Sequence, residues 1–230
     1  MACYLLQVSV IVSNFAANHR PKTIDNINTT KKLKLELIMK RIGLSLMMIL
    51  TCVMAFSQDE VVDYLHVGKT LKFQDKKFEL KWCQHPIEAF YLQEWLPKGE
   101  TFDNYEQMLS VSLSFSETLS VKYFVDAKVH ELEERKKSDK CCNYLVYEND
   151  GEYIIDFLVS DGADGLLNVV EADIHHYKPV VIDGKKAIQL NFYSRRAYGD
   201  DIIPFLESLK EKKVDWIKEL TQMKIVCKMK

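Results

Sequence analysis

Asp173, His175 and His176 are the residues whose types and spacing most suggest chemistry. Asp173 and His175 are two positions apart, so on a strand both side chains point to one face, while His176 points to the other. A carboxylate and an imidazole on one face could bind a metal ion or transfer a proton. The favoured interpretation is a solvated polar strand end. A metal site would need a third ligand, for instance His130 or His85.

A second group of candidates surrounds the turn at residues 97–99, which has the sequence Pro-Lys-Gly. Exposed aromatic side chains beside acidic ones would suit recognition of a peptide or a glycan, because the rings supply contact area and the acids supply orientation. The alternative is that Trp95 packs in the core and the other residues shape the turn. The candidate ligand-binding residues are Glu94, Trp95, Glu100, Asn104 and Tyr105.

Motifs with a defined reaction are missing from the sequence. The Ser160–Gly165 segment is acidic and rich in glycine, but it lacks the spacing of a calcium loop. No G-x-S-x-G nucleophile motif is present, and the cysteines lack the paired spacing of a zinc site. We therefore expect no cofactor.

Residues 39–57 have the three-part plan of a signal peptide. Lys40 and Arg41 precede an apolar run, Ile42–Val53, and small residues precede a cleavage point after Ser57. The run is shorter than the roughly 20 residues that cross a bilayer as a helix. The sequence therefore predicts periplasmic or secreted localisation, with membrane contact only during export. Attachment of a lipid to Cys52 is less favoured, because Thr51, the residue before it, fits the motif for lipid attachment poorly.

A signal peptide should begin with its charged segment, yet residues 1–38 precede that segment here. We therefore interpret residues 1–38 as an over-extended leader, with natural translation starting at Met39. The alternative is a genuine extension in which Ile42–Val53 is a core helix. Charge favours the first interpretation, because residues 1–57 carry a net charge of +5 and residues 58–230 carry −7.

Residues 58–230 are long enough for one globular domain with a substantial core. The chain is 47% hydrophobic and 11% aromatic, which excludes extensive disorder. The negative charge argues against nucleic acid as a partner. Export permits disulfides; free thiols are one alternative, and the favoured bridge would join Cys141 or Cys142 to Cys227.

Hydrophobic periodicity predicts an α+β fold with a mainly antiparallel sheet of about 7–9 strands. Turns are expected at Asn149-Asp150-Gly151 and Asp183-Gly184. Apolar stripes predict two helical segments, at about 118–137 and 201–222. Residues 224–229 are a candidate closing strand.

The stretch from Glu94 to Glu100, followed by Asn104-Tyr105 and a long strand, resembles small bacterial exported domains with a PsbP-like fold. The later Asp215-Trp216-Ile217 stretch resembles the end of a helix in those domains. This resemblance implies an α+β fold and a binding role, and it transfers no ligand residues.

Together these features predict an exported, non-enzymatic binding domain whose partner is an envelope protein, a peptide or a glycan. The alternative is a small hydrolase or metal-dependent enzyme that uses Asp173 and His175.

Overall fold

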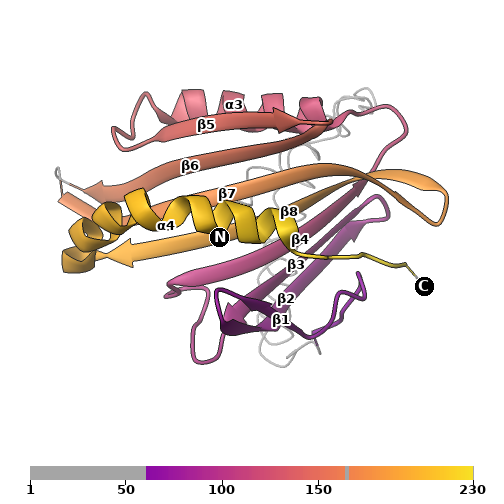
Figure 1. Ribbon diagram of the computed structural model, residues 1–230, viewed down its shortest axis with the longest axis horizontal. Coiled ribbons are helices and arrows are strands. Elements are labelled where there is room, and N and C mark those ends of the chain that lie inside the picture. Colours follow the sequence, from indigo (N-terminus) through magenta and orange to yellow (C-terminus); the bar gives the residue numbers. More distant parts are fainter. Residues whose placement is uncertain (1–60, 164–165, 230) are drawn as a thin grey trace, which may run out of the picture. The chain divides into compact units, whose positions relative to one another are not determined.

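The computed structural model describes residues 61–163 and 166–229 (Figure 1). Val61–Lys230 forms one compact unit. Residues 1–57 lie outside the described part of the chain. The leader predicted at 1–38, the signal peptide predicted at 39–57 and the alternative of lipid attachment at Cys52 therefore stay predictions.

Eight antiparallel strands form one sheet, in the spatial order β1-β2-β3-β4-β8-β7-β6-β5. Consecutive strands are neighbours except where β8 returns to pair with β4, so the sheet consists of two meanders joined at its centre. The strands are β1 (Thr70–Phe73), β2 (Lys76–Ile87), β3 (Phe90–Pro97), β4 (Gln107–Phe115), β5 (Asn143–Asn149), β6 (Glu152–Ala163), β7 (Leu166–Ile182) and β8 (Lys185–Tyr198).

Two tight turns set the register of the second meander. Asp150 and Gly151 have φ angles of 52° and 77°, and Asp183 and Gly184 have 51° and 77°. Positive φ at both central positions is typical of the type I′ turn, whose twist matches that of the flanking strands. Both predicted hairpins are therefore confirmed.

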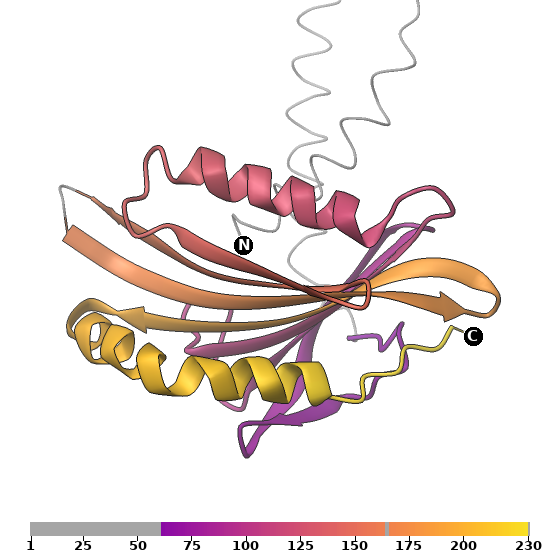
Figure 2. The ribbon, with the colours of Figure 1, turned by 45° about the horizontal axis from the view of Figure 1, so that its top comes forward.

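Within the described residues, two helices complete the fold, α3 (Val121–Arg135) and α4 (Ile202–Gln222), the latter after the short 3-10 turn η1 (Gly199–Asp201). Ser120 caps α3, with its side-chain oxygen accepting a bond from the backbone N–H of Tyr123. Figure 2 shows the two helices on opposite faces of the sheet. The predicted α+β class is confirmed, including both helical segments.

The α4 face of the sheet holds the main apolar core. The ring of Trp216 on α4 lies 5.7 Å from that of Tyr193 on β8. Tyr193 pairs with Leu109 on β4, which in turn pairs with Trp95 on β3. Because cross-strand partners share a face, Trp95 belongs to this core, where it is fully buried.

The α3 face is more polar. Lys128 of α3 lies 4.7 Å from the ring of Phe157 on β6, and Arg135 donates to the carbonyl of Ser160 at 2.8 Å. Phe157 pairs with Asp173 on β7, so the alternate residues of β7 that include Asp173 and His175 lie on the α3 face.

Three expectations need correction. Residues 224–229 form no strand; Lys228 donates one backbone bond to Leu65. Strand β7 continues through Pro179 to Ile182, because both strands of the hairpin extend to the turn. Asp173 and His175 therefore lie in mid-strand, and both are buried. No disulfide forms between Cys141 or Cys142 and Cys227, because Cys142 packs against α3 and Cys227 lies in the α4-face core.

Trp95→Ala should strongly destabilise the fold. The indole is fully buried, and its Nε1 donates to the carbonyl of Gly68 at 3.0 Å. Truncation leaves a cavity and an unpaired carbonyl, so the free energy of unfolding should fall by about 3–5 kcal/mol. Urea unfolding followed by circular dichroism measures this change.

The matched control is Trp82→Ala, because Trp82 is 37% exposed. It should cost about 1 kcal/mol or less. Equal losses for the two variants would contradict the placement of Trp95 in the core.

Candidate functional site

Asp173 and His175 lie together on the α3 face of β7, with exposures of 4% and 3%. The imidazole of His175 sits among aromatic rings, 4.9 Å from Phe157 and 4.5 Å from Phe192 between ring centroids. Its Nδ1 lies 3.0 Å from the hydroxyl of Tyr177. The neighbours of His175 therefore form an apolar and aromatic environment.

The surroundings of this pair favour its uncharged forms. Burial lowers the pKa of His175 well below 6.5, and the positive charge of Lys128 lowers it further. Burial also raises the pKa of Asp173 well above 3.8, and the nearby Glu171 carboxylate adds to this effect. Lys128 and Ser194 act in the opposite direction on Asp173.

The described residues supply no third metal ligand beside Asp173 and His175. Within residues 61–163 and 166–229, no group of three or more His, Cys, Asp and Glu side chains could hold a metal ion. Of the two suggested partners, His85 stacks on Tyr91 at 3.9 Å, and His130 is exposed on α3.

Glu171 is the centre of a polar cluster beside Asp173 that the sequence did not single out. Its Oε1 accepts from Ser194 Oγ at 2.7 Å and from the hydroxyl of Tyr105 at 3.4 Å. Its Oε2 lies 2.5 Å from Arg196 Nε, and the Arg196 guanidinium lies 4.1 Å from the Tyr105 ring. The glutamate thus ties β7 and β8 to the segment that precedes β4.

One sequence signal could have indicated this cluster. Glu171 and Asp173 alternate on one strand, and Ser194 and Arg196 alternate on another. Once β7 and β8 are paired, Glu171 lies opposite Arg196, and Asp173 opposite Ser194. The register that creates these pairs depends on the hairpin turn at Asp183-Gly184, ten or more positions away, which is why residue types alone did not reveal the cluster.

The five candidate ligand-binding residues of the turn region are dispersed. Glu94 and Trp95 point to opposite faces of β3, and burial raises the pKa of Glu94 to about 7. Glu100 accepts backbone bonds from Glu106 and Gln107, which closes the loop before β4. Asn104 forms a bridge with Thr101, and Tyr105 belongs to the Glu171 cluster. Their ligand-binding role stays a prediction.

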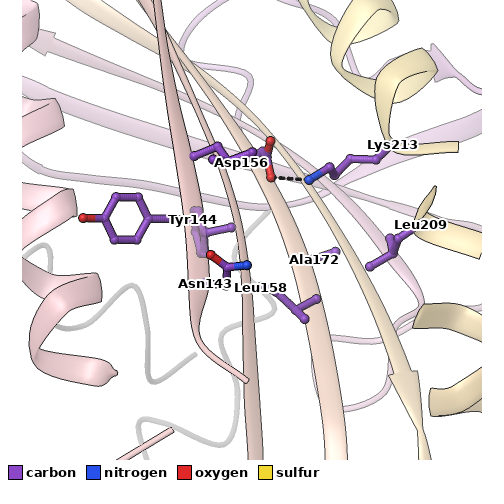
Figure 3. A pocket seen from close by; sticks show the side chains of 9 residues that line it. Asn143, Tyr144, Asp156, Leu158, Ala172, Leu209 and Lys213 are labelled. Atoms are coloured by element: carbon purple, nitrogen blue, oxygen red, sulfur yellow. Dashed lines mark hydrogen bonds and ion pairs between the residues drawn. The ribbon is translucent and has the colours of Figure 1, made fainter. Parts of the chain in front are cut away.

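A pocket of about 130 Å³ lies on the α4 face of the sheet, where α4 runs beside β6 (Figure 3). Leu158 of β6, Ala172 of β7 and Leu209 of α4 give it apolar walls. Asn143 and Leu145 bring the last strand, β5, to its rim. Because these side chains come from four elements, no local sequence pattern marks the pocket.

An ion pair closes one side of this pocket. Lys213 Nζ on α4 lies 2.6 Å from Asp156 Oδ1 on β6, as the dashed line in Figure 3 marks. The other oxygen, Oδ2, accepts from the hydroxyl of Tyr147 at 3.2 Å. Asp156 is buried, with 4% of its surface exposed. Both of its oxygens are therefore paired, so the apolar side chains and Asn143 at the rim are the parts of the pocket open to contact.

Comparison with known proteins identifies a family but no function. A family model matches residues 65–225, so the chain belongs to that family, a domain of unknown function. No curated protein and no solved structure matches the chain significantly. Among the described helices, none is long and apolar enough to cross a membrane.

Lowering the pH should reduce the free energy of unfolding of the wild type relative to that of a variant with an uncharged residue in place of His175. The unfolded chain protonates this histidine near 6.5, whereas the folded chain does so only well below 6.5. Unfolding therefore takes up a proton below about pH 6.5, and the stabilisation is lost as the pH falls. Asp173 has a raised pKa and acts with the opposite sign, so wild type must be compared with His175→Gln.

The measurement is the unfolding free energy of both proteins between about pH 7.5 and 5.5. The difference between them should shrink by up to about 1.4 kcal/mol per pH unit below pH 6.5. A constant difference across this range would show that His175 titrates normally in the folded chain.

Proposed function

We propose that this protein is a non-enzymatic binding domain, exported to the periplasm or the cell exterior, that takes an apolar side chain of a peptide or protein partner. The observation that carries this proposal is the pocket between α4 and strands β5, β6 and β7.

Its size favours a side chain over a whole small molecule. Sites for drug-sized molecules and cofactors measure roughly 300–1,000 Å³, whereas an apolar cavity of about 150 Å³ accommodates a benzene-sized group. At about 130 Å³ the pocket fits one such group. The remainder of the partner would contact the rim, where Leu145 is 51% exposed.

Its chemistry favours an apolar group over a glycan. Leu158, Ala172 and Leu209 provide surface that an aliphatic or aromatic side chain would remove from water. The one buried carboxylate, Asp156, already has both oxygens paired. A sugar would need several hydrogen-bond partners, and the polar groups of the lining beside Asp156 are Asn143 at the rim and Lys213, which is already paired with Asp156. The resemblance to PsbP-like domains is compatible with a binding role and stays a proposal.

Filling part of the pocket should weaken binding. Selection of a randomised peptide-display library on the immobilised full chain should yield sequences with a shared apolar residue. Ala172→Leu would occupy part of the pocket and should weaken the binding of those peptides at least tenfold, which is about 1.4 kcal/mol. Leu209→Ala would enlarge the pocket and should shift selection towards larger apolar residues.

Val181→Ala is the matched control, because Val181 is a 68% exposed residue of the same strand as Ala172. It should leave peptide affinity unchanged. Circular dichroism confirms that each variant is folded. Peptides that bind Ala172→Leu as tightly as wild type would refute the pocket as the binding site, and so would a selection that enriches no peptide.

The export part of the proposal has its own test. The intact, non-reduced mass of the protein recovered from the producing cell should correspond to a chain that begins at Gln58, allowing for pyroglutamate. Such a mass would also show whether the thiols of Cys83, Cys141, Cys142 and Cys227 are free. A mass that corresponds to a chain beginning at Met1 or Met39 would refute cleavage. A lipid-sized addition at Cys52 would indicate that the exported protein is attached to a membrane.

A further inference from the structure

The two edges of the sheet differ in how well they are protected from pairing with another strand. The edge strand β1 has four residues, including Lys72. Short edge strands and lysines are devices that prevent association between sheets. The opposite edge, β5, has seven residues and contains no lysine, arginine or proline. Its one charged side chain, Glu148, lies near the turn to β6, so the centre of the strand lacks this protection.

The side chains of β5 are exposed as well as apolar. Leu145 is 51% exposed, Val146 is 40% exposed and Tyr147 is 45% exposed. These values hold although α3 lies near one face of β5 and the pocket near the other. Three consecutive exposed apolar residues on an edge strand are typical of a segment that pairs with a further strand.

The hairpin geometry determines which backbone groups face outward. Asp150 and Gly151 form a two-residue turn, in which the carbonyl of Asn149 accepts from the N–H of Glu152. Hydrogen-bonded and non-bonded pairs alternate along an antiparallel ladder. Tyr147 and Leu145 thus bond to β6, and the outward N–H and C=O groups belong to Tyr144, Val146 and Glu148.

We propose that β5 pairs antiparallel with β5 of a second copy of this chain, around a two-fold axis at Val146. This register places Val146 opposite Val146, Leu145 opposite Tyr147, and Tyr144 opposite Glu148. The residues on the axis carry outward backbone groups, so they form a hydrogen-bonded pair. The interface is isologous, as a two-fold dimer requires, and the two sheets join into one.

Charge complementarity supports a second copy as the occupant. Tyr144, Val146 and Glu148 share the α3 face, because Tyr144 pairs with Phe157. The Lys136 ammonium lies 4.2 Å from the Tyr144 ring. Lys136 also pairs with Glu133 of its own chain, 3.0 Å away. In the proposed register Glu148 of each copy therefore approaches Lys136 of the other, and the two carboxylates share that ammonium, once on each side of the axis. No like charges within β5 face each other, and apolar pairs occupy the centre.

The test is the oligomeric state of the full chain by sedimentation velocity over the micromolar range. Wild type should form a dimer. Val146→Lys places two ammonium groups opposite each other on the axis and should weaken the dimer at least tenfold. Val214→Lys is the control, because Val214 is 68% exposed and belongs to α4, outside the proposed strand pair; it should leave the dimer unchanged.

A second variant identifies the register directly. Paired residues of this type have Cα atoms about 5.5 Å apart, within the range of a disulfide. Val146→Cys should therefore form a disulfide-linked dimer on mild oxidation, whereas Lys72→Cys on the opposite edge should not. Reducing agent should reverse the link.

Several outcomes would overturn self-pairing: a wild-type monomer throughout the concentration range, a Val146→Lys dimer as tight as wild type, or equal cross-linking of both cysteine variants. A monomer whose β5 instead binds a selected peptide would assign this edge to a different partner. The pocket is tested independently, because its apolar wall of Leu158, Ala172 and Leu209 lies on the α4 face while Val146 lies on the α3 face.

Discussion

The alternation of side chains along β7 is the constraint on which the rest of the structure depends. This strand has seventeen residues, and its centre pairs with β6 on one side and with β8 on the other. Ala172 and Ile174 point into the apolar core beneath α4, while Asp173 and His175 point towards α3. A shift of one residue would exchange these two sets, placing a carboxyl and an imidazole in the apolar core. Register is therefore strongly specified, and the type I′ turn at Asp183-Gly184 enforces it.

The two faces of the sheet consequently contribute differently to stability. The α4 face joins large apolar side chains such as Trp95, Tyr193 and Trp216, whose burial is the main favourable term in folding. The α3 face buries polar groups, which cost free energy unless they are paired. Glu171 satisfies this requirement through Ser194, Tyr105 and Arg196. Asp173 satisfies it less completely, since its Oδ1 has no hydrogen-bond partner, and its raised pKa reduces the charge that must be buried.

The two proposed contact surfaces share the last strand of the sheet. β5 contributes Asn143 and Leu145 to the rim of the pocket and presents its outer backbone edge to solvent. The matched family spans residues 65–225 and therefore includes both surfaces. Since the ion pair between Asp156 and Lys213 anchors α4 over β6, the same contact that shapes the pocket also holds the helix in place. Pairing at the edge would use the outward backbone groups of β5, whereas the apolar wall of the pocket lies on its α4 face, and Leu145 is a residue that both surfaces contain.

Local signals in the amino-acid sequence were sufficient to predict the elements of secondary structure. Strand alternation, the Asp-Gly turns and the apolar stripes of 118–137 and 201–222 predicted an antiparallel α+β fold correctly, because each signal acts over a few residues. Which polar residues are buried, and which of them pair with one another, follows only from the packing of the folded chain. Asp173 and His175 have the residue types of a solvated strand end, but in the folded chain α3 lies near them. Asp156 pairs with Lys213, which is 57 positions away in the sequence. Burial and long-range pairing depend on what packs over a strand, and no local pattern encodes that.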